Sequence, residues 1–351
     1  MRESRTSANT LNAQQLSKHN KETNYVRGYY LADDKDQLIV SLDWSAVELV
    51  LIGECSGDLN FAEAYGQRPH KDLHGPAAAR ALGMSMEEYN VHPDKKMYRS
   101  KVGKPSNFGY WYSGWLATTA KEMGWDMNQT AEAVRAYAEG FPIGEEWRLN
   151  TIALVKKQGF VQLPDGHRRV RFEATQNWEA QFLEAFEALG GGDAYLEFAR
   201  RAMAQIQRRA GNQAVNAMIQ GSCGSLAKRA ILSMKAKIKE KGLRARFMLL
   251  IHDEVLFSVH KDDCLEVMDL LYDEMIQGRG IVNNLVLDSS IAIGYTFQPY
   301  DANRAPYGQI ELMELPEGIE GIAPERVGCR ATQEERALVI KHLTNRPSTM
   351  V

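Results

Sequence analysis

Two aspartates more than two hundred residues apart are the residues best suited to chemistry in this sequence. Asp253 lies beside Glu254 between two apolar, strand-forming runs, and Asp43 ends another such run. A carboxylate framed by apolar strands is costly to bury unless a cation compensates its charge. If the two strand ends meet, they predict a site for two divalent cations about 3.5–4 Å apart, which suits in-line attack at phosphorus. For the Asp253 turn taken alone, an acidic surface turn is an equal alternative.

The elements that must position these acids can be read from the surrounding pattern. Residues 246–259 consist of two β-forming apolar runs separated by three polar residues. They predict a buried hairpin with His252, Asp253 and Glu254 at its tip. Residues 38–43 predict a short buried strand. Residues 44–55 then predict a helix that ends at Gly57.

Length and composition limit the remaining possibilities. A chain of 351 residues with 44% hydrophobic content can bury a core divided among two or three subdomains. The net charge of −3 gives no general indication of a nucleic-acid partner, and each local basic run is more often a solvated face. The four cysteines have no close spacing, which fits a reducing compartment, and no uncharged apolar run is long enough to span a bilayer.

Three motifs together resemble family A DNA polymerases, the DNA polymerase I family. The run Asp43-Trp-Ser-Ala-Val-Glu48-Leu resembles their first palm motif, and His252-Asp253-Glu254 resembles their last one. Between them, Lys104-Pro-Ser-Asn-Phe108-Gly-Tyr-Trp-Tyr112 resembles the fingers motif, whose intervals of four place its cation and two aromatics on one helix face. The resemblance covers roughly residues 5–299, with the motifs in the family's order.

The resemblance implies an α+β fold: a right-hand palm, built from an antiparallel sheet with helices, and mainly helical fingers. The palm would comprise residues 1–60 and 213–299, and the fingers residues 61–212 with a helical insertion at about 176–208. Residues 300–351 would form a C-terminal appendage, either a docking element or a passive tail. A capping box from Thr332 to Glu335 predicts one short helix within it.

The same resemblance implies a catalytic and metal-binding set. Two Mg²⁺ ions, replaceable by Mn²⁺, would bind Asp43, Asp253 and the backbone carbonyl of Trp44, with Glu254 behind them. Lys104 would bind phosphate and act as a candidate general acid toward the leaving pyrophosphate. The implied nucleotide-binding residues are Glu48, His74, Arg99, Lys101, Lys104, Phe108 and Tyr112.

The implied DNA contacts are spread along the resemblance. Asn212, Asn216 and Gln220 recur at intervals of four on a helix that we expect to end at Gly242. Amide side chains suit the minor-groove acceptors present at every correct base pair. The full implied set is Arg5, Gln14, Arg168, Arg169, Asn212, Asn216, Gln220 and His252.

The fingers motif departs from the family pattern in one respect. The family has an arginine four residues before the lysine, where this chain has Ser100, with Arg99 and Lys101 on either side. Pro105 would also remove a backbone donor from the helix. We therefore predict a kink or π-bulge near Pro105 that brings Arg99 onto the Lys104 face; in a regular helix Lys101 would be the better phosphate ligand.

These features predict template-directed 5′–3′ DNA synthesis from dNTPs on a primer by a two-metal mechanism. Glu48 against Tyr112 would exclude a ribose 2′-hydroxyl. The alternatives are a non-catalytic DNA-binding or assembly subunit and a two-metal nuclease, although neither explains the fingers motif. Because no part of the chain resembles the family's thumb or exonuclease domain, we also expect a separate subunit that carries them. This arrangement would be that of a split, phage-like system acting in the cytoplasm.

Overall fold

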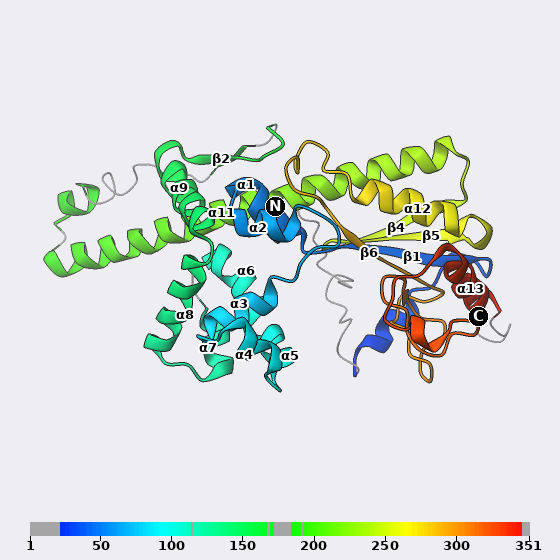
Figure 1. Ribbon diagram of the computed structural model, residues 1–351. Coiled ribbons are helices and arrows are strands. Elements are labelled where there is room, and N and C mark those ends of the chain that lie inside the picture. Colours follow the sequence, from blue (N-terminus) through cyan, green and yellow to red (C-terminus); the bar gives the residue numbers. More distant parts are fainter. Residues whose placement is uncertain (1–21, 114–115, 167–168, 172–183, 191, 346–351) are drawn as a thin grey trace. The chain divides into compact units, whose positions relative to one another are not determined.

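The structure, a computed structural model, describes residues 22–113, 116–166, 169–171, 184–190 and 192–345 (Figure 1). The chain divides into two compact units. Among the described residues, one, the helical unit, comprises those within 48–225 and 280–286; the other, the sheet unit, comprises residues 22–47, 226–279 and 287–345.

The sheet unit is built on a five-stranded antiparallel sheet of order β4-β5-β1-β6-β7. The central strand β1 contains Leu38, Ile39, Val40 and Leu42, all fully buried, as expected for an apolar run covered on both faces. Helix α12 packs on β1, β5 and β6 (Figure 1). The elements are η2 (Asn24–Tyr29), β1 (Gln37–Trp44), β4 (Ala245–Ile251), β5 (Glu254–His260), η5 (Lys261–Asp263), α12 (Cys264–Met275), β6 (Ser289–Gly294), β7 (Ile310–Glu311), η6 (Pro324–Arg326) and α13 (Gln333–Thr344).

The helical unit consists of helices and one small hairpin whose boundaries follow local signals. Ser85 and Asp126 open α4 and α8 with capping boxes, and Pro142 occupies the first turn of α9. The elements are α1 (Val47–Ser56), α2 (Leu59–Tyr65), α3 (His74–Ala81), α4 (Met86–Val91), α5 (Lys95–Tyr98), η3 (Arg99–Gly103), α6 (Lys104–Ser113), α7 (Ala117–Met123), α8 (Met127–Glu139), α9 (Pro142–Gln158), β2 (Phe160–Gln162), β3 (Arg169–Arg171) and α11 (Asp193–Glu240). Helix α11 belongs to this unit up to Ser225 and to the sheet unit from Leu226.

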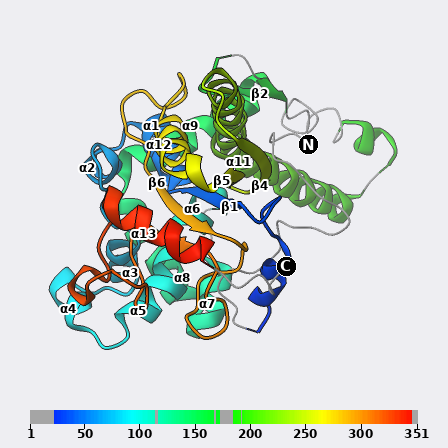
Figure 2. The ribbon, with the colours of Figure 1, turned by 90° about the vertical axis from the view of Figure 1, so that its right-hand side faces the viewer.

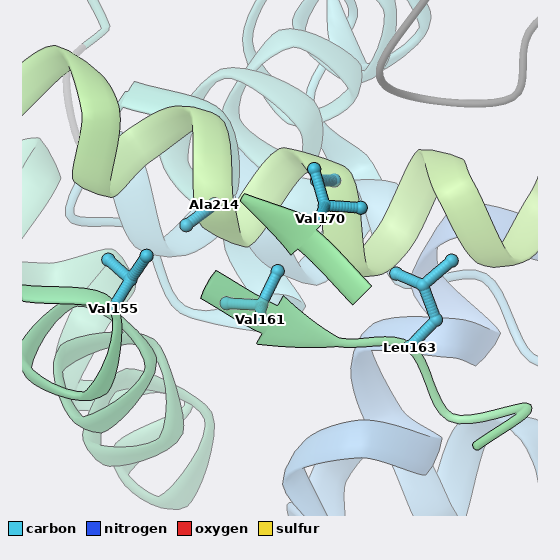
Figure 3. Close-up of a cluster of buried hydrophobic side chains, with 6 residues drawn as sticks. Val155, Val161, Leu163, Val170 and Ala214 are labelled. Carbon is cyan, nitrogen blue, oxygen red and sulfur yellow. The ribbon is translucent and has the colours of Figure 1, made fainter. Parts of the chain in front are cut away.

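A compact apolar cluster fixes α11 against the hairpin of β2 and β3 (Figure 3). Val161 and Val170 face each other across the two strands, and Leu163 follows β2. Val155 of α9 and Ala214 of α11 complete the cluster with Ala217. The small side chains of α11 let the hairpin approach closely, so that this stretch of the helix is held in place.

The C-terminal appendage packs on the sheet unit. Strand β7 extends the sheet beyond β6, and α13 packs on α12, with an ion pair of 2.6 Å between Arg336 and Asp269 (Figure 2). Gln309, only 6% exposed, donates from Nε2 to the carbonyl oxygens of Ile39 and Thr296, each at 3.2 Å, and accepts from Ser41 Oγ at 3.0 Å. Residues 300–345 are therefore packed into the sheet unit, and the two alternative roles of this segment, a docking element or a passive tail, both stay predictions.

The α+β prediction is confirmed, and so are the hairpin of residues 245–260 and the capping box that opens α13 at Thr332. Helix α11 ends two residues before Gly242, whose φ of +67° fits the predicted cap. The helix predicted from Trp44 begins later, at Val47, because β1 continues through Trp44. The predicted palm and fingers boundaries stay a prediction. Among the described residues, no helix has the length and apolar character needed to cross a membrane.

Candidate functional site

The two aspartates lie at neighbouring strand ends in the sheet unit. Strands β1 and β5 pair antiparallel, with Asp43 opposite Glu254, and β6 places Ser290 on the other side of Asp43. The backbone N–H of Trp44 reaches the carbonyl oxygen of Asp253 at 3.5 Å. The turn that carries Asp253 is tight because His252 adopts a left-handed backbone with φ of +56°. The structure thus brings together the two strand ends whose meeting the sequence suggested.

Glu254 differs from the prediction, which placed it with Asp253 at the tip of the hairpin. It is the first residue of β5, is 8% exposed and points to Arg27, whose Nη2 donates to the carboxylate at 3.1 Å. The Arg27 guanidinium lies over the Phe297 ring, 3.6 Å from its centroid. Burial lowers the pKa of Arg27, and the Glu254 carboxylate opposes that effect. Glu254 therefore forms an ion pair with Arg27 inside the sheet unit, and the prediction that it lies at the tip of the hairpin was wrong.

Arg27 was not identified from the sequence. The available signal was one arginine within an aromatic stretch, Tyr25 to Tyr30. Its partner lies 227 residues away, a separation that local pattern cannot bridge.

The donor groups at the Asp43 and Asp253 end fit a hard divalent cation. Two carboxylates and the backbone carbonyl of Trp44 supply oxygen ligands alone, the type that Mg²⁺ prefers. Within the described ranges, no group of three or more histidine, cysteine, aspartate or glutamate side chains is arranged to hold a metal.

The fingers stretch contains the predicted π-bulge. Helix α5 passes into the π-helical turn η3 and then into α6, and the backbone N–H of Lys104 donates to the carbonyl of Arg99, five residues earlier. That wider turn places Arg99 one turn before Lys104, as predicted. Gly103 is required within it, because a Cβ there would lie 1.9 Å from the carbonyl oxygen of His74.

Arg99 is held by Asp72, which the sequence did not single out in this role. Its Nε and Nη2 donate to the two carboxylate oxygens of Asp72 at 3.0 and 2.8 Å. Burial alone would raise the pKa of Asp72, but hydrogen bonds from Arg99 and from the N–H groups of His74 and Gly75 outweigh it and lower that pKa. Asp72 therefore both accepts hydrogen bonds from the first two N–H groups of α3 and orients the arginine.

The charges of Arg99 and Lys104, the two cations of the fingers motif, both affect the pKa of His74. Burial lowers its pKa to about 4, and the charges of Arg99 and Lys104 act in the same direction, while Asp72 opposes them. Its Nδ1 lies 2.8 Å from the Asn107 side-chain nitrogen, and its ring centroid lies 6.0 Å from that of Phe108. The imidazole is consequently neutral at physiological pH, with a fixed orientation beside the two cations.

The two faces of α6 have different roles. Asn107 and Trp111 are buried and joined through Tyr137, whose hydroxyl donates to Asn107 Oδ1 at 2.5 Å and accepts from Trp111 Nε1 at 3.1 Å. This network fixes the rotation of the helix about its axis. On the other face, Lys104 is exposed and Phe108 is partly buried.

Tyr112 joins three elements of the helical unit. Its hydroxyl donates a short hydrogen bond to the carboxylate of Glu48 on α1. Burial raises the pKa of Tyr112 well above its ordinary value, Glu48 raises it further, and a hydrogen bond with Gln220 of α11 opposes them. The predicted pairing of Glu48 with Tyr112 is thus present in the structure.

The amide residues follow one face of α11 as predicted. Asn212 Nδ2 reaches the carbonyl oxygen of Ser113 at 3.5 Å, Asn216 is partly buried, and Gln220 is 8% exposed. Arg169 lies on β3, and Lys101 is exposed within η3. The predicted contacts Arg5, Gln14 and Arg168 lie outside the described residues.

Comparison with known proteins gives a consistent result. The sequence model of DNA polymerase family A matches residues 2–298. DNA polymerase I of Bacillus subtilis (strain 168) is 26% identical over 301 residues, which are 85% of this chain and 30% of that protein. DNA polymerase I of Chloroflexus aurantiacus is 27% identical over 82% of this chain and 26% of that protein. The chain therefore spans less than a third of these curated relatives.

A solved structure supports the fold. The POL domain of Pol1 from M. smegmatis, in complex with DNA primer-template and dNTP, superposes with a TM-score of 0.69 at 22% identity. The superposition covers 85% of this chain and 46% of that one. At this level of identity, the likeness shows a shared polymerase-domain fold.

Proposed function

Since the chain belongs to DNA polymerase family A, we propose that it extends a primer along a DNA template by nucleotidyl transfer from dNTPs to the primer 3′-hydroxyl. The observation that carries the proposal is the junction at the end of β1, where Asp43 and Trp44 lie beside Asp253 and Glu254. Two carboxylates held by backbone pairing are pre-organised, as electrostatic catalysis of phosphoryl transfer requires.

Asp43, Asp253 and the Trp44 carbonyl are the proposed ligands of two Mg²⁺ ions, with Mn²⁺ as a substitute. When bound, the ions would supply Lewis-acid stabilisation of charge at the reacting phosphate. The chain's own contribution is to fix the carboxylates. Glu254 supports them from behind, because its ion pair with buried Arg27 fixes the start of β5 next to Asp253.

We propose that the outward face of α6 binds the nucleotide. Lys104 would hold the triphosphate and donate a proton to the leaving pyrophosphate. Arg99, oriented by its hydrogen bonds to Asp72, would add a second phosphate contact. Phe108 and Tyr112 would stack on the base and sugar. The carboxylate of Glu48, bonded to Tyr112, would leave no room for a 2′-hydroxyl and so select dNTPs.

The partners proposed are primer-template DNA and dNTPs, with action in the cytoplasm, which the four free cysteines fit. A separate subunit with a thumb or exonuclease rests on the sequence resemblance and needs its own test.

The test is primer extension on a primed DNA template with dNTPs and Mg²⁺, with and without extract from the source. It compares the unchanged chain with Asp253→Ala and with Asp34→Ala, a matched change at an exposed aspartate of the same unit. We expect extension that is abolished in Asp253→Ala and retained in Asp34→Ala. Extension that needs extract would indicate a partner subunit. Absence of Asp253-dependent extension in both conditions would refute the proposal and favour a non-catalytic DNA-binding subunit.

A further inference from the structure

A small cavity lies in the sheet unit, where the C-terminal appendage meets the sheet. Its volume is about 200 Å³, which is smaller than typical cavities for drug-sized ligands. The match to the family model ends at residue 298, and one wall of the cavity comes from residues beyond that point. These residues include Pro299, Tyr300, Glu311, Glu314 and Pro316. The cavity is therefore a feature that the family resemblance does not explain.

The cavity carries an excess of negative charge. At its buried end, Arg27 and Glu254 neutralise each other through their ion pair. Glu311 and Glu314 add two further carboxylates, and no second cation is found among the described residues that line the cavity. Glu314 is exposed. Carboxylates in this excess repel phosphates and attract a cation, which excludes a nucleotide or a nucleic-acid strand as the occupant.

The cation that fits this cavity is organic. In the part of the chain that the structure describes, no group of three or more histidine, cysteine, aspartate or glutamate side chains could hold a metal ion. An ammonium or guanidinium group can instead pair with the carboxylates one by one. The aliphatic stem of a lysine or arginine can then lie on the apolar surface of Pro299, Tyr300 and Pro316.

Arg27 requires a hydrogen-bond acceptor in addition. Its side chain is 5% exposed, and its Nη2 donates to Glu254. Its Nε is buried and has no hydrogen-bond partner among the described residues, and a buried donor without an acceptor is costly. A simple amine offers only donors, whereas a peptide offers carbonyl oxygens beside its basic side chains. A peptide therefore suits both ends of the cavity.

We propose that this cavity binds a short basic segment of a partner protein, with a lysine or arginine against Glu311 and Glu314 and a carbonyl oxygen of the same segment on Arg27 Nε. The acidic surface continues beyond the cavity. Glu317 is exposed, and its backbone carbonyl accepts from the hydroxyl of Tyr300 at 3.5 Å. Several basic residues in the segment would thus add to its attraction. The inference is independent of the proposed function, because the binding needs neither DNA nor dNTPs.

The test measures the binding of fluorescein-labelled tetralysine amide to the full chain, without DNA, by fluorescence anisotropy at low salt. We expect Glu314→Lys to weaken binding about tenfold, because it replaces an attraction by a repulsion. The matched control is Glu320→Lys, the same charge reversal at an exposed glutamate of the appendage outside the cavity lining. It should weaken binding by about twofold or less.

Competition with spermine separates a peptide from a small amine. Spermine and unlabelled acetyl-tetralysine amide carry a similar charge near neutral pH, but only the peptide has carbonyl oxygens. We expect the peptide to compete about fivefold better than spermine. Arg27→Lys keeps a cation for Glu254 and removes Nε, so this advantage should disappear in that variant.

Three results would count against the inference. Absence of tetralysine binding, or equal effects of Glu314→Lys and Glu320→Lys, would show that the cavity is not the site and would overturn the proposal. Equal competition by spermine would assign the cavity to small amines and overturn the choice of a peptide. A peptide advantage that persists in Arg27→Lys would refute the contact with Arg27.

Discussion

Replacement of Gln309 by alanine should destabilise the sheet unit, because its amide ties the C-terminal appendage to β1. Gln309 donates to the carbonyl of Ile39 and accepts from the hydroxyl of Ser41, both on β1, the strand that carries Asp43. It also donates to Thr296. The alanine variant would leave these groups buried without their partner.

The expected magnitude follows from two buried hydrogen bonds and one partly buried hydrogen bond. Each contributes about 1 kcal/mol, and a group left unsatisfied in a buried site costs about 1–3 kcal/mol. Because water can reach part of the space that a truncated side chain leaves, we expect a total loss of about 3 kcal/mol in the free energy of unfolding. A loss of this size should also lower DNA synthesis at elevated temperature, since β1 carries Asp43.

The measurement is urea unfolding of the full chain at 25 °C, followed by far-UV circular dichroism. Gln333→Ala is the control, because Gln333 belongs to the same appendage and is exposed at the first position of α13. We expect the control to change the unfolding free energy by less than about 0.5 kcal/mol. If Gln309→Ala changes it as little, the amide does not anchor the appendage and the reasoning is wrong.

Three further predictions concern the helical unit. Gly103→Ala should cost about 2–3 kcal/mol of stability in thermal unfolding, because its Cβ would collide with the His74 carbonyl, whereas Gly192→Ala, with open space around it, should be neutral. The pKa of His74 is about 4, below its unfolded value of about 6.5, so its stabilising effect is complete above pH 6.5 and is lost as the pH falls toward 4. Between pH 7.5 and 5, the unchanged chain should therefore lose about 1–2 kcal/mol more than His74→Gln in urea unfolding; equal losses would show that the imidazole is not buried. Glu48→Ala should raise ribonucleotide incorporation relative to deoxynucleotide incorporation by about tenfold or more in single-nucleotide extension. Glu48→Gln should raise this ratio by less, because the glutamine side chain keeps an acceptor for the Tyr112 hydroxyl. An unchanged ratio in both variants would contradict the sugar-selection role.

The parts of the candidate site that the sequence predicted are those with a strong local signal. An apolar run that ends in an acid predicted the strand of Asp43, and the polar break between two apolar runs predicted the turn of Asp253. The π-helical turn could be predicted because Pro105 and the displaced Arg99 are two local irregularities that one extra residue in the helix explains together.

The contacts that were not predicted are long-range. Arg27 meets Glu254 and Gln309 meets Ser41 across separations of 227 and 268 residues, and no periodicity connects such positions. The bond of Asp72 to Arg99 likewise depends on how α3 and η3 pack. Secondary structure follows from the local chain, whereas the choice of ion-pair partner follows from tertiary packing.

The topology of the sheet unit also affects how the chain is made. Strand β1 pairs with β5 and β6, so more than two hundred residues must be synthesised after it before either neighbour exists. At about 5–20 residues per second, this interval lasts about 10–40 s on the ribosome. Throughout it, an apolar strand rich in leucine, isoleucine and valine has both edges open, which favours association with other chains. Expression at low temperature or with chaperones that hold nascent chains should therefore increase the yield of folded protein more than changes to the mature surface.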